Sequence, residues 1–144
     1  MTYPLGSILL VRDYLLPTTV KDKYFIVIGI NENEYNLLSM TTSQIYFDPA
    51  LIRHGIIKDR DMSVYCFECG RVIGKNGFSF HKHTIVSHRS NIHIFTIEKI
   101  TKLKIEMQDI LLKEELENLI YSFYRANIPN KYKNMFEQTL SLIM

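Results

Sequence analysis

One segment of the chain, from Lys23 to Ser43, carries a cation at its start and hydroxyl groups at its end. Lys23 opens one apolar run, and Thr41, Thr42 and Ser43 close the next. An ammonium group and an alcohol can together stabilise negative charge that develops on an oxygen. A plainer role is open as well, because most lysines are solvated and threonines favour strands. The chemistry depends on whether the fold brings the two ends to one surface.

A second group of residues has spacing typical of metal ligands. Two residues separate Cys66 from Cys69, thirteen separate Cys69 from His83, and four separate His83 from His88. This spacing is within reach of a Cys2His2 zinc site. The sequence between them alternates like a strand and holds an Asn-Gly turn, unlike the strand-turn-helix of a zinc finger. Two inert thiols and surface histidines are the alternative interpretation, and we expect no metal.

Length, composition and charge exclude several classes of protein. The 144 residues, 47% of them hydrophobic, suit one globular domain. Apolar runs are far shorter than the roughly 20 residues that cross a bilayer, so we expect no membrane span. The start of the chain lacks the pattern of a secretion signal and two cysteines indicate no disulfide framework, so we expect a cytoplasmic location. The net charge of +2 is too weak to mark a surface for duplex nucleic acid.

The elements that must position these residues are strands in the first two thirds of the chain. Apolar residues there come in short β-branched and aromatic runs separated by turn residues. The predicted strands are 7–12, 23–30, 34–41, 63–68, 78–86 and 92–95. Turns are predicted at 31–33 and 74–77, the second as an Asn-Gly hairpin, and loops at Pro17 and Pro49.

Helices are predicted after about Lys102. Five apolar residues recur there at intervals of three and four and place one stripe on a helix: Leu112, Leu116, Leu119, Ile120 and Phe123. Asp109 can open this helix, and a second helix over 131–142 follows Pro129. Residues 103–107 alternate and fit either a last strand or a helical lead-in. Short antiparallel strands followed by helices indicate an α+β fold, with a small barrel or curled sheet closed by a helix.

The strand segments resemble the start of the PemK/MazF toxin family. The stretch Gly6-Ser7-Ile8-Leu9-Leu10-Val11, a loop, Lys23-Tyr24-Phe25-Ile26-Val27-Ile28 and then Leu37 to Ser43 follow the order and spacing of that family's first three strands. The likeness covers about residues 6–95. It implies an SH3-like antiparallel β-barrel over 1–101, with 102–144 as a C-terminal helical extension packed on it in a single domain.

The resemblance also implies a function. Members of the family are cytoplasmic homodimers that cleave single-stranded RNA without metal or cofactor and are neutralised by an antitoxin peptide or protein. Lys23 stands where the family has an arginine, and Thr41, with Thr42 beside it, where it has a catalytic hydroxyl. Ser43, Arg53, His54 and Lys21 are the residues that the resemblance implies for RNA binding, and the loop 13–22 is the segment implied for base selectivity.

Departures from the family pattern leave an alternative open. Lysine supplies charge but not the planar fork that arginine offers a phosphate. Tyr24 replaces the family's proline after the arginine, and Ser7 replaces an acidic residue. The chain could instead be a non-catalytic SH3-like module that binds a peptide, a protein or nucleic acid. It contains no Gly-rich phosphate loop, HExxH or GxSxG, so nothing indicates nucleotide hydrolysis or serine-nucleophile chemistry.

Overall fold

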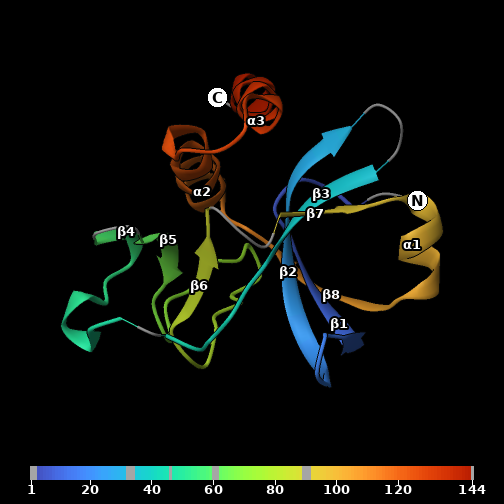
Figure 1. The fold of residues 1–144 in the computed structure, drawn as a ribbon, viewed down its shortest axis with the longest axis horizontal. Helices are drawn as coiled ribbons and strands as arrows, with labels where there is room; N and C mark the ends of the chain where they lie inside the picture. The colour runs from blue at the N-terminus through green and yellow to red at the C-terminus, as the bar shows by residue number, and fades with distance from the viewer. Residues whose placement is uncertain (1–2, 32–34, 46, 60–61, 89–91, 144) are drawn as a thin grey trace.

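The computed structural model describes residues 3–31, 35–45, 47–59, 62–88 and 92–143, with only the backbone described at 31 and 35–38. These residues form two antiparallel sheets and three α-helices, two of the helices at the C-terminal end (Figure 1). The predicted α+β class is confirmed. No helix among the described residues has the length and apolar character needed to cross a membrane.

The larger sheet has five strands in the order β7-β3-β2-β1-β8. Its strands are β1 (Ser7–Leu15), β2 (Val20–Asn31), β3 (Tyr35–Met40), β7 (Ile92–Phe95) and β8 (Lys104–Ile110). The apolar stretches 8–11 of β1 and 25–28 of β2 are buried on both faces of the sheet. Ile8, Ile26 and Ile28 point to one core, and Leu9 and Phe25 to another.

The smaller sheet has three strands in the order β4-β5-β6. Its strands are β4 (Gly55–Asp59), β5 (Met62–Phe67) and β6 (Thr84–Ser87), and a short 3-10 helix, η1 (Pro49–Leu51), precedes them. A bridge between Thr42 and Ile85 ties the end of β3 to β6 and so joins the two sheets. Both sheets are open in the described part of the chain, with β7 and β8 at the edges of the larger one.

The helices are α1 (Ile97–Lys102), α2 (Lys113–Arg125) and α3 (Asn130–Ile143). Figure 1 shows α2 and α3 packed together, with α1 on the opposite side of the five-stranded sheet. The main core contains side chains of β1, β2, β5, β6, α2 and α3, so both sheets share it with the C-terminal helices. Ile100 of α1 joins the second core, on the other face of the larger sheet.

Several predicted elements need correction. The predicted strand over 78–86 is a strand only from Thr84. Residues 78–80 instead hydrogen-bond with the segment before the 74–77 turn, where Gly70 donates to the Phe80 carbonyl. Asp109 does not open a helix: it lies in β8, and α2 begins at Lys113. The residues 103–107 belong mostly to that strand. The β4 strand and α1 were not predicted, and the predicted turn at 31–33 lies mostly outside the described residues.

Candidate active site

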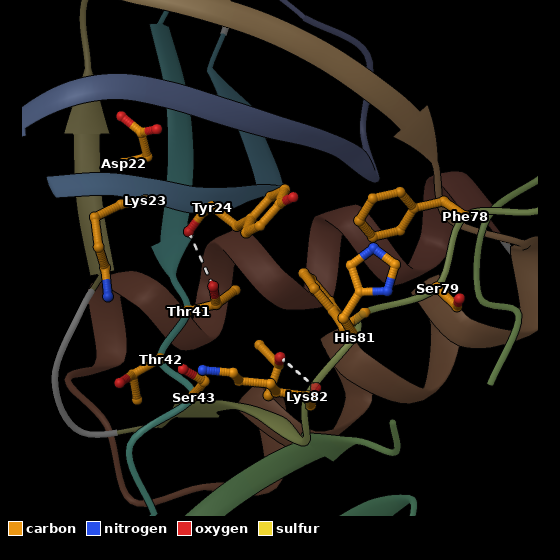
Figure 2. Close-up of a pocket in the computed structure, with 12 residues that line it drawn as sticks. Asp22, Lys23, Tyr24, Thr41, Thr42, Ser43, Phe78, Ser79, His81 and Lys82 are labelled. Carbon is orange, nitrogen blue, oxygen red and sulfur yellow. Dashed lines mark hydrogen bonds between the residues drawn. The ribbon is translucent and has the colours of Figure 1, made fainter. Parts of the chain in front are cut away.

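A pocket of about 270 Å³ lies where the start of β2, the end of β3 and the segment before β6 meet (Figure 2). The hairpin of β2 and β3 contributes six lining residues: Asp22, Lys23, Tyr24, Thr41, Thr42 and Ser43. The segment before β6 and the first residue of β6 contribute the other six: Phe78, Ser79, Phe80, His81, Lys82 and Thr84. The lysine and the hydroxyl residues from the two ends of the sequence segment therefore line one cavity.

Lys23 is the half-buried cation of this pocket. It lies near the start of β2, opposite Val11 of β1. Burial, reinforced by the positive charge of Lys21, lowers the pKa of the Lys23 ammonium. No carboxylate in the described part of the chain forms an ion pair with Lys23. Its charge is therefore available to an anion that enters the pocket.

Asp22 is the acidic residue that lines the pocket, but its carboxylate is engaged elsewhere. Figure 2 shows this carboxylate pointing away from the Lys23 ammonium, on the other side of the strand. Its two oxygens accept hydrogen bonds from the Asp13 N–H at 3.0 Å and from Arg12 Nη1 at 2.9 Å, which lower the Asp22 pKa. Arg12 is held in turn by Glu106. The acidic residue therefore does not neutralise the cation.

The two threonines at the end of β3 differ in what their hydroxyls can do. Thr41 is 3% exposed, and its hydroxyl donates to the Tyr24 carbonyl at 3.2 Å. The Thr42 hydroxyl oxygen accepts the Gln44 N–H at 3.1 Å, which leaves its own proton free to donate into the pocket. Thr42 is therefore the hydroxyl better able to donate to a developing negative charge, although the sequence pattern favours Thr41.

Sequence reasoning missed the opposite wall of the pocket. Phe78, Phe80, His81 and Lys82 lie in the segment that was predicted as a strand. The rings of Phe78 and Phe80 pack edge to face with each other and with Tyr24, with centroids 5.1 to 5.9 Å apart. Aromatic side chains can stack on bases in single-strand binders, but the sequence alone favours core packing for Phe78 and Phe80, which is the commoner role of such rings.

Asp109 of β8 holds this wall in place. Its buried carboxylate accepts backbone N–H groups of Asn76 at 3.0 Å and Phe78 at 3.1 Å. A side chain at position 74 would collide with it, since a Cβ built on Gly74 would lie 2.1 Å from an Asp109 carboxylate oxygen. The predicted turn at 74–77 is present, with Gly77 at a φ of 93°. This turn orients Phe78 toward Tyr24.

The other residues proposed for RNA binding do not all lie in the pocket. Ser43 lines the pocket, whereas Lys21, Arg53 and His54 do not. The Arg53 guanidinium donates to the Ile56 carbonyl at 3.0 and 3.2 Å. The loop implied for base selectivity is mostly strand, because β1 runs to Leu15 and β2 starts at Val20, and Asp22 is its only residue that lines the pocket.

His54 instead belongs to a buried polar cluster around Glu115 of α2. Its Nδ1 accepts the Glu68 N–H, so the ring proton lies on Nε2, which donates to the Glu115 carboxylate at 2.8 and 2.9 Å. Tyr65 donates its hydroxyl to the same carboxylate at 3.2 Å, and Arg71 lies 4.0 Å from it. The implied RNA contact by His54 is not supported by this position.

The Cys2His2 set is not gathered in the structure. Among the described residues no three His, Cys, Asp or Glu side chains lie together as a metal site. Cys66 is fully buried in β5, and burial, with Glu68 as a smaller cause, raises the pKa of its thiol to about 11. The Cys69 N–H donates to His83 Nδ1 at 3.0 Å. His88 is not on the surface: it is fully buried between the hydroxyls of Ser63 and Ser122.

Comparison with known proteins gives no match. No protein-family model, no curated protein and no solved structure aligns significantly with the chain.

Proposed function

We propose that this protein is an endoribonuclease of the PemK/MazF type that cleaves single-stranded RNA in the pocket of Lys23 and Thr42. One observation carries the proposal: Lys23 and the residues from Thr41 to Ser43, far apart in the sequence, line the same cavity. The proposed architecture is an SH3-like barrel in which the bridge between Thr42 and Ile85 wraps the smaller sheet against the larger.

The reaction we propose uses the substrate's own 2′-hydroxyl as nucleophile. Its oxygen bonds to the adjacent phosphorus while the bond from phosphorus to the 5′-oxygen breaks, which leaves a 2′,3′-cyclic phosphate and a 5′-hydroxyl. Negative charge grows on the phosphate oxygens, and the Lys23 ammonium and the Thr42 hydroxyl can stabilise it. The step needs no metal because the cation is supplied by the side chain.

Two protons must move in this reaction. One leaves the 2′-hydroxyl and passes to solvent, since the His81 ring lies beside Phe78, on the far side of the pocket from Lys23 and Thr42 (Figure 2). The other must reach the departing 5′-oxygen. A lysine whose pKa is lowered by burial gives up its proton more readily, so Lys23 is suited to donate it.

A second candidate function is a non-catalytic module that binds an anionic partner in the same pocket. It is favoured by two observations: lysine lacks the fork that arginine gives to a phosphate, and the Thr41 hydroxyl is already donated to Tyr24. This module would bind RNA or an acidic peptide without changing it. Cleavage, rather than binding, separates the two functions.

The proposal extends to partners. A toxin of this type would act in the cytoplasm as a homodimer and would be silenced by an antitoxin peptide or protein. A partly disordered acidic peptide suits a cationic pocket, because such segments fold as they bind. Co-expression of such a peptide, encoded beside this gene, should then relieve toxicity.

The test is expression in a bacterial host together with cleavage of labelled RNA by the purified protein in the presence of EDTA. The wild type should arrest growth and release fragments that end in a cyclic phosphate. Lys23→Ala should lower the cleavage rate by about 100- to 1,000-fold. Lys23→Arg keeps the positive charge but cannot give up a proton, so its rate should fall between those of Lys23→Ala and the wild type. Lys131→Ala, on α3 outside the pocket, is the control and should cleave like the wild type.

A substrate with a 2′-deoxy sugar at the cleavage site should resist the wild-type protein. Normal growth, with intact RNA in the purified reaction, would contradict the proposed enzymatic function and favour the non-catalytic binding module.

A further inference from the structure

A second cation, Lys82, lines the same pocket as Lys23. Lys82 lies in the segment before β6, and the Thr84 hydroxyl donates to its carbonyl at 2.9 Å, which fixes the backbone at this point. Figure 2 shows the Lys82 side chain extending toward Ser43, on the side of the pocket where Lys23 and Thr42 also lie. We name this group of four residues, Lys23, Thr42, Ser43 and Lys82, the phosphate end.

The phosphate end carries positive charge without internal compensation. No ion pair joins Lys23 or Lys82 to a carboxylate within the described residues. The acidic residue on the pocket wall, Asp22, is bound to Arg12 and to the Asp13 N–H. Two ammonium groups beside two hydroxyl residues suit a phosphate, which accepts hydrogen bonds from all of them. Together the two lysines offer the two-point contact that a single lysine in place of arginine cannot.

The other side of the pocket is apolar and aromatic. Tyr24, Phe78 and Phe80, which we name the aromatic end, all line the cavity. Tyr24 and Phe78 are partly exposed, whereas Phe80 is 4% exposed and anchors the group in the main core. Partly exposed rings held by neighbouring rings form a rigid surface on which a nucleobase can stack.

We infer that the pocket binds one nucleotide, with its phosphate between Lys23 and Lys82 and the adjacent base against Tyr24 and Phe78. This inference rests on the proposed function and adds the residues that select the substrate. The volume of about 270 Å³ lies just below the range of about 300 to 1,000 Å³ for small-molecule sites, so it suits one nucleotide rather than a longer segment. The segment 78–82, rather than the loop 13–22, is then the part of the chain that contacts the base.

The test uses an oligonucleotide that cannot be cleaved. A fluorescent, mixed-sequence single-stranded oligodeoxynucleotide lacks the 2′-hydroxyl, so its binding can be followed by anisotropy at several salt concentrations. Lys82→Ala should reduce the slope of log K against log salt by about 0.7, the value for loss of one phosphate contact on a single strand. Lys131→Ala removes the same charge outside the pocket and should leave the slope unchanged.

The aromatic end is tested in the same assay. Phe78→Ala should weaken binding by about 5- to 150-fold, the range for loss of one stacked base, without changing the salt slope. Phe78→Leu keeps apolar packing but removes the ring, so it should weaken binding while thermal unfolding stays near the wild type. Phe78→Tyr should bind normally. This separates the loss of stacking from a general loss of structure.

The outcomes distinguish this inference from the proposed function. RNA cleavage by the wild type, combined with normal binding by Lys82→Ala and Phe78→Leu, would overturn the inference and leave the enzyme standing. Absence of cleavage, combined with the expected changes in slope and affinity, would overturn the enzyme and support the nucleotide site. Failure of the wild type to bind the oligodeoxynucleotide would overturn the inference outright.

Discussion

Two clusters of polar side chains in this protein, the pocket and the group around Glu115 of α2, differ in whether their charges are paired. In the pocket, the charges of Lys23 and Lys82 have no ion-pair partner among the described residues. On α2, the carboxylate of Glu115 is matched by His54 and Tyr65. Buried polar groups are normally satisfied, as in the cluster around Glu115, whereas the partly buried Lys23 and the exposed Lys82 carry charges that a ligand in the pocket can pair.

The saturated cluster joins α2 to the smaller sheet. Glu115 and Ser122 lie two turns apart on one face of α2 and contact His54 and His88 respectively. We call this contact the seam. The family resemblance implied His54 for RNA binding, and His88 belonged to a possible zinc set that was not expected to bind metal, since residue type alone does not distinguish a ligand-binding histidine from a satisfied one. The predictions below test the contrast between the seam and the pocket.

The largest effect is expected from Glu115→Ala. It leaves the buried donors of His54 and Tyr65 without an acceptor, and each costs about 1 to 3 kcal/mol, so the free energy of unfolding should fall by about 2 to 6 kcal/mol. Glu114→Ala, at the exposed neighbour on α2, should change it by less than about 0.5 kcal/mol. Urea denaturation measures both. A loss below about 1 kcal/mol for Glu115→Ala would mean that the seam is solvated and the contrast is wrong.

Thr42→Val tests the pocket in the same way. Removal of a hydroxyl that donates to the transition state should slow RNA cleavage about 100- to 1,000-fold and leave stability close to the wild type. Thr41→Val should show the reverse pattern, with a smaller effect on cleavage and a loss of about 1 kcal/mol of stability, because the Thr41 hydroxyl is bonded to Tyr24. Single-turnover rates and urea denaturation separate them. Equal rates for the two variants would contradict the role assigned to Thr42.

The seam also predicts a pH dependence. Burial, with the charge of Lys58 as a smaller cause, lowers the pKa of His88 from 6.5 to about 4. Below pH 6.5 the unfolded chain binds a proton at His88 that the folded protein does not bind. The free energy of unfolding therefore falls as the pH falls toward 4. The contribution is about 2 kcal/mol between pH 7 and pH 5. His88→Gln should remove this dependence, and His81→Gln, at an exposed histidine, should leave it as in the wild type. An unchanged profile in His88→Gln would show that other groups control acid stability.

Much of the fold could be predicted from local pattern. Continuous apolar runs gave β1 and β2, and the three- and four-residue spacing from Leu112 to Phe123 gave α2. The β4 strand was missed because it ends in charged residues after a glycine, the pattern of a loop. Asp109 was assigned to a helix start because Asp is a good N-cap, whereas tertiary contacts with the turn before Phe78 hold it in β8.

Only one wall of the pocket could be predicted from the sequence. Lys23 and Thr41 could be singled out because they flank two obvious strands. The wall made by Phe78, His81 and Lys82 depends on the pairing of residues 78–80 with the segment before the 74–77 turn and on a bend at 81–82, which the alternation of this segment does not reveal. The choice between Thr41 and Thr42 depends on two hydrogen bonds, one that Thr41 donates to the Tyr24 carbonyl and one that Thr42 accepts from the Gln44 N–H, which no sequence pattern specifies.

The smallest expected effect concerns the charge of the pocket itself. Asp22→Asn removes the acidic charge on the pocket wall while its amide oxygen can still accept the Asp13 N–H, so the fold should be retained. Affinity for single-stranded RNA at low salt should rise by about 1.4- to 5-fold and return to the wild-type value at high salt, where exposed charges are screened.

Asp59→Asn, at an exposed position at the end of β4, removes the same charge outside the pocket and is the matched control. A larger gain for Asp22→Asn than for Asp59→Asn would mean that RNA responds to charge in this cavity rather than to the net charge of the protein. Equal gains would mean that the unpaired lysines are ordinary solvated cations. The seam would then still explain stability, but the pocket would lose the electrostatic argument for a bound phosphate.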